Sequence, residues 1–230
     1  GYGIAVDGSG NVYVTGRSDA TWNGDNNASP LHAHSGGYNS DIVVLKLDSS
    51  GAYKWHTFYG SGSDDYGNRI AVNGTGNVYV TGGGNATWNG DGNASPKHAH
   101  SGGSDIVVLK LDASGAYQWH TFYGSGSYDY DSGYGIAVDG SGNVYVAGES
   151  YATWNGDNNE SPLHAHSGSA DIVVLRLDSN GTYQWHTFYG SAYQDVGHGI
   201  AVDGNVDVYV TGYSPATWNG ENNASPPTCS

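Results

Sequence analysis

Short stretches of alternating apolar and polar residues recur along the sequence, and glycine-rich turns separate them. Residues 4–6 form a short apolar stretch. Residues 11–15 then place two valines on one side and a tyrosine on the other. Between them, Asp-Gly-Ser-Gly at residues 7–10 has the composition of a tight turn, since glycine adopts positive φ without steric cost. The pattern predicts a β-hairpin.

A second hairpin is predicted beyond a long polar segment at residues 18–40. Residues 41–47 are apolar on both faces at their start, so we expect a strand that is covered on both sides. Residues 48–51 form the next turn. Residues 53–59 then bring Tyr, Trp, Thr and Tyr to one face of a fourth strand.

The whole pattern repeats at a nearly constant period. The isoleucine of the first strand recurs at spacings of 66, 66 and 64, as Ile4, Ile70, Ile136 and Ile200. Asp-Ile-Val-Val-Leu and Trp-His-Thr-Phe-Tyr-Gly each occur three times, and the last unit lacks both. We therefore interpret residues 1–230 as a single repeat array, with units at about 1–65, 66–131 and 132–195 and a half unit at 196–230.

Two hairpins in series at a fixed period are typical of a β-propeller blade, a four-stranded antiparallel sheet whose two faces pack on neighbouring blades. The predicted fold is therefore all-β, with about 3.5 blades in this chain. No stretch has a period of 3.6 residues, so essentially no helix is expected. A β-solenoid is the competing interpretation, but its coils usually have much shorter periods.

The residues that carry this pattern resemble the seven-bladed β-propeller repeat family. They are Gly-Ile-Ala-Val-Asp-Gly-Ser-Gly-Asn-Val-Tyr-Val-Thr-Gly at 3–16, Asp-Ile-Val-Val-Leu-Lys-Leu-Asp at 41–48, and Trp-His-Thr-Phe-Tyr-Gly at 55–60. The resemblance covers nearly the whole chain. It implies a large, secreted or surface-attached bacterial or archaeal protein, and it supplies no catalytic residues. The longer segment between the second and third strands, with its Trp and His residues, departs from the family pattern.

Three and a half blades cannot close a seven-fold ring alone, and an open end exposes apolar faces and unpaired strand edges. Three solutions are open. The chain can be part of a longer protein, two copies can combine into one ring, or copies can associate head to tail into a filament. The chain does not begin with Met, and we expect it to be a processed or excised piece of something longer.

The composition of the chain restricts the classes of partner that it can bind. The formal net charge of −15 opposes binding to nucleic acids and to anionic membranes, and is compatible with cations or neutral polar ligands. No apolar run approaches the length of a membrane span. A single cysteine, Cys229, excludes an internal disulfide framework. The low lysine content and the many Asn-Gly pairs favour an extracellular or cell-surface location.

The polar segment repeats Ala-Thr-Trp-Asn-Gly followed by an acid. An indole beside amide and carboxylate groups is suited to bind a sugar, because the apolar face of a pyranose stacks on the ring. Alternatively, each Trp holds its own loop against the blade. The candidate ligand-binding residues are Trp22, Asn23 and Asp25, then Trp88, Asn89 and Asp91, then Trp154, Asn155 and Asp157, and finally Trp218, Asn219 and Glu221.

Each complete unit also carries a His-Ala-His motif. In an extended segment the side chains at i and i+2 face the same way, so two imidazoles can ligate zinc, copper or nickel. The pairs are His32 and His34, His98 and His100, and His164 and His166, and His56, His120 and His186 are candidates for a third ligand. The alternative is a polar loop in which these imidazoles bind backbone carbonyls.

Two further features concern cations and glycans. Residues 7–11 loosely resemble a calcium loop but lack its length and distal Glu, and a plain hairpin turn is the simpler interpretation. The acids that follow each Trp-Asn-Gly are equally possible calcium ligands. Asn-X-Ser/Thr sequons are frequent, and those in the polar segment are at Asn27, Asn93, Asn159 and Asn223.

We expect the chain not to be an enzyme, because an active site needs one asymmetric group of residues and here the acids and histidines recur from unit to unit. The leading hypothesis is an extracellular structural or adhesive protein that self-assembles and presents repeated loops. The alternatives are a carbohydrate-binding propeller that uses the Trp/Asn loops and a metal-binding propeller that uses the His pairs with a divalent cation, calcium or zinc. The expected partners are further copies, the rest of a longer chain, or glycans.

Overall fold

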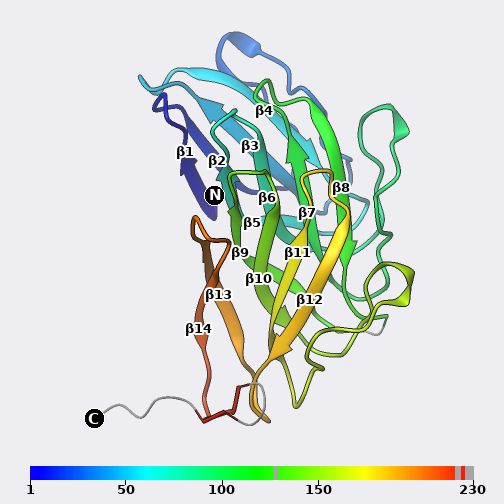
Figure 1. Cartoon of the computed structure of the whole chain (residues 1–230). Helices are drawn as coiled ribbons and strands as arrows, with labels where there is room; N and C mark the ends of the chain where they lie inside the picture. Colours follow the sequence, from blue (N-terminus) through cyan, green and yellow to red (C-terminus); the bar gives the residue numbers. More distant parts are fainter. Residues whose placement is uncertain (127–128, 221–223, 226–230) are drawn as a thin grey trace.

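A computed structural model describes residues 1–126, 129–220 and 224–225 (Figure 1). Its strands form three four-stranded antiparallel sheets, here called blades, and one two-stranded sheet. The first blade contains β1 (Gly3–Val6), β2 (Val12–Ser18), β3 (Asp41–Leu47) and β4 (Tyr53–Tyr59). The second contains β5 (Asp65–Val72), β6 (Val78–Gly84), β7 (Asp105–Leu111) and β8 (Tyr117–Tyr123).

The third blade and the half blade follow the same order. The third contains β9 (Ser132–Val138), β10 (Val144–Ser150), β11 (Asp171–Leu177) and β12 (Tyr183–Tyr189), and the half blade contains β13 (Val196–Val202) and β14 (Val208–Tyr213). In the described residues, helical structure is limited to the short 3₁₀ turns η1 (Asp25–Asn27), η2 (Asp91–Asn93) and η3 (Asp157–Asn159). The prediction of an all-β chain of about three and a half four-stranded antiparallel blades is confirmed.

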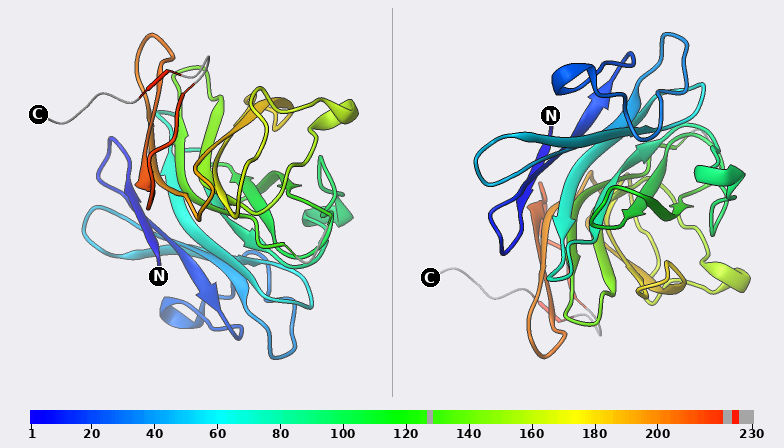
Figure 2. Two further views of the ribbon diagram at one scale, coloured as in Figure 1. Left: turned by 90° about the horizontal axis from the view of Figure 1, so that it is seen from below. Right: turned by 90° about the horizontal axis from the view of Figure 1, so that it is seen from above.

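The blades stand side by side, with their first strands next to one another on the inside of the array (Figure 2). Within each complete blade the strands pair in sequence order. Short turns join the first strand to the second and the third to the fourth, and the long polar segment joins the second to the third. The alternation of side chains predicted from the sequence gives each blade two apolar faces, and the faces of adjacent complete blades pack on each other.

The first hairpin of each later blade contains a β-bulge. In the second blade the bulge lies between Gly67 and Arg69, opposite Gly82. A Cβ atom on Gly82 would lie 1.8 Å from the carbonyl oxygen of Tyr66, so only glycine fits there. Gly148 meets Ser132 in the same way at 1.9 Å. The bulge thus explains a glycine that recurs in the second strand.

Apolar side chains from two blades fill each junction between them. At the first junction Ile42 and Val44 enter from β3. Val107, Leu109 and Leu111 enter from β7 on the other side, and all five are fully buried. The second junction is built the same way from β7 and β11. Burial of these branched side chains on both faces supplies the main stabilisation of the array.

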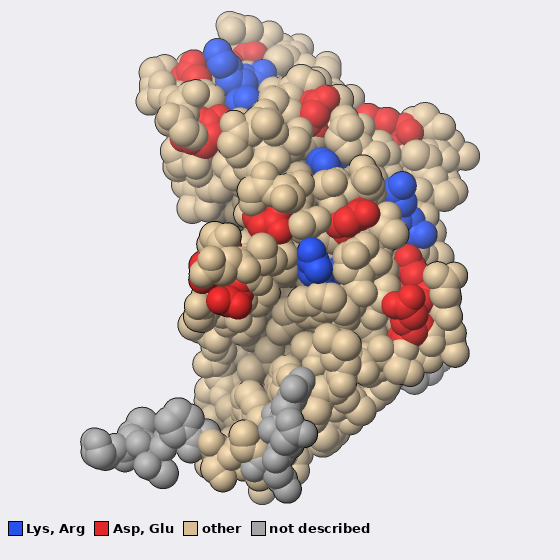
Figure 3. Space-filling view, in the orientation of Figure 1, with Lys and Arg blue, Asp and Glu red and all other residues tan. Residues whose placement is uncertain are grey.

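Both ends of the array leave apolar surface uncovered. In β1, Ala5 packs into the first junction, and its neighbours Ile4 and Val6 point the other way with 69% and 59% of their surface exposed. At the other end, a pocket of about 310 Å³ lies between the third blade and the half blade. Acidic and basic side chains intersperse on the upper and middle parts of the face in Figure 3, and the residues described at its lower end are uncharged.

Candidate functional site: the inserted segments and the blade junctions

The polar segment between the second and third strands of each blade, here called the inserted segment, runs along the outer edge of that blade. The backbone N–H of Leu31 donates to the carbonyl of His56 at 2.9 Å, and that of Phe58 donates to the carbonyl of His32 at 3.1 Å. The second and third blades repeat these bonds along β8 and β12. The inserted segment therefore satisfies backbone groups of an edge strand that would otherwise be open to pairing with other chains.

The tryptophan of each inserted segment stacks on the histidine of its own fourth strand. The rings of Trp88 and His120 lie 3.8 Å apart and within 6° of parallel, and Phe122 meets the indole edge-on. His120 also contacts the carbonyl of Trp88 through Nε2 and the hydroxyl of Tyr117 through Nδ1. Equivalent stacks join Trp22 to His56 and Trp154 to His186.

A tyrosine of the preceding blade covers the other face of the indole. Tyr59 stacks on Trp88 with ring centroids 5.9 Å apart, and Tyr123 stacks on Trp154 at 5.7 Å. Trp88 and Trp154 are consequently only 5% and 6% exposed. They do not form the exposed sugar platform suggested by the sequence, because protein rings cover both faces of each indole.

The terminal tryptophans differ because each has one partner fewer. Trp22 stacks on His56, and no blade of this chain precedes it, so it is 37% exposed. Trp218 stacks on Tyr189, and no fourth strand follows it among the described residues to supply a histidine. The four tryptophans of the sequence motif are therefore not equivalent in the folded chain.

The acid of each motif accepts a hydrogen bond from the same tyrosine that covers the indole. The hydroxyl of Tyr59 donates to Asp91 at 3.1 Å, and that of Tyr123 donates to Asp157 at 3.0 Å. Burial, with the neighbouring carboxylate, raises the pKa of both tyrosines. Asp25 lies in the first blade, so no tyrosine of an earlier blade reaches it in this structure, and Glu221 lies outside the described residues. These acids thus help to lock successive blades together.

The asparagines of the inserted segment hold a tight turn. The side chains of Asn23, Asn89 and Asn155 donate to Asn27, Asn93 and Asn159 respectively, at 2.7 to 2.8 Å. The three acceptors have φ of 63° to 65°, in the left-handed region that asparagine tolerates better than most residues. They are exposed sequon residues, while Asn223 lies outside the described residues. Asn219 is also exposed.

The two histidines of each His-Ala-His motif lie on opposite faces of the blade. His32 stacks on Tyr59 at 4.7 Å, whereas His34 lies edge-on to Phe58, the preceding residue of β4. Their expected common orientation is therefore not observed. The second and third blades repeat this arrangement with His98 and His100, and with His164 and His166.

The proposed third ligands are engaged elsewhere. Both ring nitrogens of His56 have partners, the hydroxyl of Tyr53 and the carbonyl of Trp22, each at 2.8 Å. His120 and His186 make the same contacts in their blades. Within the described residues, no three His, Cys, Asp or Glu side chains lie close enough together to hold a metal ion.

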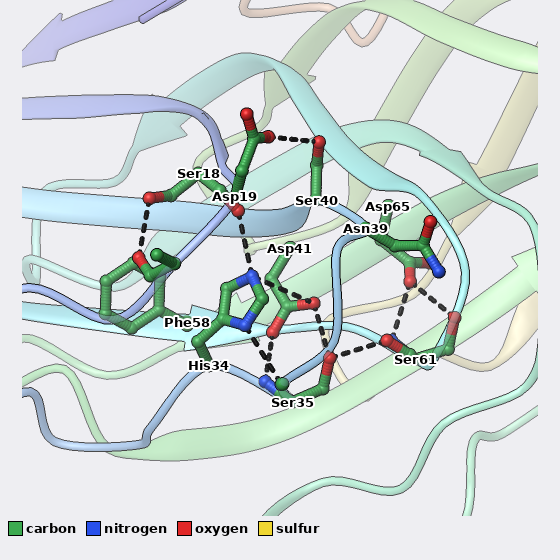
Figure 4. Close-up of polar contacts among 12 residues, drawn as sticks. Ser18, Asp19, His34, Ser35, Asn39, Ser40, Asp41, Phe58, Ser61 and Asp65 are labelled. Carbon is green, nitrogen blue, oxygen red and sulfur yellow. Dashed lines mark hydrogen bonds and ion pairs between the residues drawn. The ribbon is translucent and has the colours of Figure 1, made fainter.

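Pairs of buried aspartates, here called the acid pairs, lie at the junctions between blades. At the first junction Asp41 opens β3 and Asp65 opens β5, and serines connect them (Figure 4). Ser35 donates its backbone N–H and its hydroxyl to Asp41 at 2.6 and 2.7 Å, and the hydroxyl also contacts the carbonyl of Ser61. Ser61 in turn donates to Asp65 at 2.6 Å.

Glycines bring the other acid pairs close together. A Cβ atom on Gly124 would lie 2.5 Å from Asp105 Oδ1 and 2.8 Å from Asp131 Oδ2, so both carboxylates face this residue. Gly190 stands in the same relation to the third acid pair, Asp171 and Asp195. All six aspartates are fully buried. Two carboxylates so placed repel each other when both are ionised.

Burial strongly shifts the pKa values of several groups at the junctions and in the fourth strands. It raises the pKa of Asp65 and of Asp105 to about 7, despite hydrogen bonds from serines, and the other carboxylate of each pair adds to the rise. Burial also lowers the pKa of His120 and of His186 to about 4. Near neutral pH these histidines are therefore uncharged, and Asp65 and Asp105 titrate.

In the turn that resembled a calcium loop, the carboxylate of Asp7 accepts hydrogen bonds from other residues of the same turn. The side chain of Asn11 and the backbone N–H groups of Asn11 and Ser9 donate to Asp7 and lower the pKa of its carboxyl to about 2. Each bond is 2.8 or 2.9 Å long. This is the geometry of an Asx-type hairpin turn.

Comparison with known proteins agrees with this architecture. Residues 1–21, 118–153 and 184–216 match the family described as Beta-propeller repeat. These three stretches are similar to β-propeller repeats, in agreement with the four-stranded blades of the structure. It is also similar to the Regulatory protein FlaEY of Caulobacter vibrioides, with 31% identity over 128 residues, or 54% of this chain. The match spans 13% of the length of that protein.

Sequence reasoning missed one group of residues at the blade junctions. The acid pairs were not predicted, although an aspartate opens each third strand and another lies near each unit boundary. Their members come from different units, so no local motif joins them.

In the described part of the chain, no helix is both long and apolar enough to cross a membrane.

Proposed function

We propose that this β-propeller repeat chain is a structural component outside the cell that associates with further copies through the open ends of its array. The observation that carries the proposal is the difference between inner and terminal blades. At the inner junctions every blade face is covered, whereas Ile4 and Val6 at one end are largely exposed. Exposed apolar faces of this kind mark interaction surfaces.

The two open ends have different surfaces. One presents the outward residues of β1, and the other presents the pocket beside β14. Association of unlike surfaces is heterologous, and it gives a ring if the rotation closes and a filament if it does not. The proposal thus covers both assemblies, and particle shape separates them.

The proposal assigns the inserted segments a structural role and no catalytic one. Their Trp and His side chains pack against strands of their own and neighbouring blades, and the same contacts recur from unit to unit. Loops held in this way are regularly spaced on the outer edge of the array. They are suited to weak multivalent contacts with other surfaces.

Sedimentation velocity over a range of concentrations tests the assembly. We expect the unmodified chain to form species larger than 24.0 kDa as concentration rises. The double variant Ile4→Lys/Val6→Lys should remain monomeric, because two buried charges would oppose docking of β1. The control Tyr38→Lys changes a residue of the first inserted segment whose side chain is fully exposed, and it should associate like the unmodified chain.

A chain that stays monomeric at every concentration would overturn the assembly proposal. Equal weakening by the β1 variant and by the Tyr38 control would show that charge, and not the open face, governs association. The location is tested separately by labelling intact and permeabilised source cells with an antibody against the chain, and signal from permeabilised cells alone would contradict it.

A further inference from the structure

The sequence contains six Asn-Gly pairs, and hydrogen bonding separates one of them from the rest. An asparagine before a glycine is chemically labile, because glycine has no side chain to hinder attack of its backbone nitrogen on the amide carbon. In five pairs that nitrogen donates its proton to a backbone carbonyl over 2.7 to 3.0 Å, which opposes the attack. These five glycines are Gly24, Gly90, Gly156, Gly181 and Gly220.

The sixth pair, Asn73 and Gly74, opens the turn between β5 and β6. Among the described residues, the backbone N–H of Gly74 has no hydrogen-bond partner. Gly74 is also exposed, and no atom lies within 4 Å of the position that a Cβ would occupy. The nitrogen of Gly74 is therefore open to the solvent and unhindered.

The side chain of Asn73 is held in a way that favours reaction at its amide carbon. Its Oδ1 accepts hydrogen bonds from the backbone N–H of Thr75 at 3.1 Å, the hydroxyl of Thr75 at 2.8 Å and the backbone N–H of Asn77 at 2.9 Å. Negative charge develops on this oxygen when a nucleophile attacks the carbon, and three donors stabilise it. The amide nitrogen has only a long contact of 3.5 Å with the hydroxyl of Tyr79, so its departure breaks no strong bond.

The equivalent turns carry the acid that such a reaction would produce. Asp7 accepts hydrogen bonds from the side chain of Asn11 at 2.8 Å and from the hydroxyl of Tyr13 at 3.0 Å. In the second blade, Asn77 instead donates to the hydroxyl of Thr75 at 3.1 Å. A carboxylate at position 73 would thus accept the two bonds that Asp7 accepts. The residues that occupy this position in the other units are Asp7, Asp139 and Asp203.

We propose that Asn73 is a site of spontaneous modification, at which the folded chain converts its own side-chain amide into a carboxylate. Hydroxide removes the proton of the Gly74 nitrogen, and this nitrogen forms a bond to Cγ of Asn73. The bond between Cγ and Nδ2 breaks, and Nδ2 takes up a proton and leaves as ammonia. Water then opens the resulting succinimide at one of its two carbonyls, which gives aspartate or isoaspartate. The overall change is hydrolysis within a single chain, so it needs no second copy.

The neighbouring Asp-Gly turn indicates why an aspartate product would persist. Hydrogen bonds from Asn11 and Ser9 lower the pKa of the Asp7 carboxyl to about 2, so Asp7 is ionised at neutral pH. An ionised carboxylate resists nucleophilic attack far better than an amide does. We therefore expect Asp7 and Gly8 to remain unchanged under conditions in which Asn73 reacts.

Peptide mass spectrometry of the full chain, incubated at about pH 8 and then digested, tests the proposal. The mass gain of an amide-to-acid conversion should appear first at Asn73, at least about threefold faster than at any other Asn-Gly pair, the range expected for one hydrogen bond. The rate should rise with pH, because hydroxide generates the nucleophile. The chain in urea is the control, and there all six pairs should react at similar rates.

Two variants test the contribution of the turn. Thr75→Val removes one donor to Oδ1 at an exposed position, keeps the backbone N–H, and should slow the reaction about twofold to tenfold. Gly74→Ala should slow it further, because the added methyl group crowds the attacking nitrogen. The folded turn accepts that methyl group, since no atom lies within 4 Å of it.

The variant Asn73→Asp represents the aspartate product. In urea denaturation at neutral pH it should be at least as stable as the unmodified chain, because its carboxylate can accept bonds from Asn77 and Tyr79 as Asp7 does from Asn11 and Tyr13. A clear loss of stability would overturn the assigned fit of the product.

Equal rates at the six pairs of the folded chain, or a faster reaction at any of the other five, would overturn the inference. An unchanged rate in Thr75→Val would show that the donors to Oδ1 do not assist the reaction. Selectivity for Asn73 that persists in urea would contradict the role of the fold.

Discussion

The indole of Trp88 is covered on one face by His120 of its own blade and on the other by Tyr59 of the preceding blade. One side chain thereby joins an inserted segment, its own fourth strand and a neighbouring blade. The hydroxyl of the same tyrosine donates to Asp91, three residues after the indole. At the scale of single residues, the motif Trp-Asn-Gly-Asp therefore holds neighbouring blades together through ring stacking and a hydrogen bond.

Removing one such indole tests that role. Trp154→Ala should lower the free energy of unfolding by about 3–5 kcal/mol, because it leaves a cavity between Tyr123 and His186. Trp22→Ala is the matched control, since Trp22 has only the histidine partner and is 37% exposed. In urea denaturation, Trp22→Ala should lower the free energy of unfolding by a clearly smaller amount than Trp154→Ala. Equal losses would show that the second stacking partner contributes nothing.

The acid pairs predict a pH dependence with a definite sign. Burial raises the pKa of Asp65 from 3.8 to about 7, so the folded chain binds this proton more tightly than the unfolded chain. The resulting stabilisation is complete below the unfolded value and is lost as pH rises through about 7. The facing groups are Asp41, Ser61 and, beyond Asp41, the imidazole of His34.

The variant Asp65→Asn isolates this effect. Between pH 5 and pH 8, urea denaturation should show a smaller fall in the free energy of unfolding for the variant than for the unmodified chain. The difference in slope should be at most about 1.4 kcal/mol per pH unit, the limit for one proton. Other titrating groups, such as Asp105, are common to both proteins. Parallel profiles would mean that Asp65 is ionised in the folded chain throughout this range.

At the scale of elements, alternation and turn composition were enough to predict each hairpin. Residues 41–47, apolar on both faces, form β3 between two neighbouring strands. The course of the inserted segment along β4 could not be predicted, because backbone groups make those contacts and leave no periodic side-chain signal. The orientation of His32 and His34 depends on that course, so it also escaped prediction.

The bulge opposite the second strand predicts a sharp sensitivity to one methyl group. Gly148→Ala would place Cβ 1.9 Å from the carbonyl oxygen of Ser132, so the first hairpin of the third blade must shift. We expect a loss of stability of more than 1 kcal/mol in thermal or chemical denaturation. Gly140→Ala is the control, because no atom lies within 4 Å of its added Cβ, and it should be nearly neutral.

At the scale of the whole molecule, the period of 64 to 66 residues predicted the number and order of blades. It also predicted an incomplete last blade, which the structure shows as β13 and β14 alone among the described residues. The acid pairs lie beyond such prediction because each forms only when two units come together in space. Sequence periodicity identifies equivalent residues, but it does not say which non-equivalent ones meet.

The junctions have a consequence for how such a chain can change in length. Tyr59 meets Trp88 across the first junction as Tyr123 meets Trp154 across the second, and an acid pair accompanies each. Any complete unit therefore presents the same two surfaces to whatever unit precedes or follows it. Recombination that duplicates or deletes one whole unit would leave every remaining contact intact, whereas a break within a unit would destroy two junctions at once. Arrays of this kind are free to grow and shrink by entire blades.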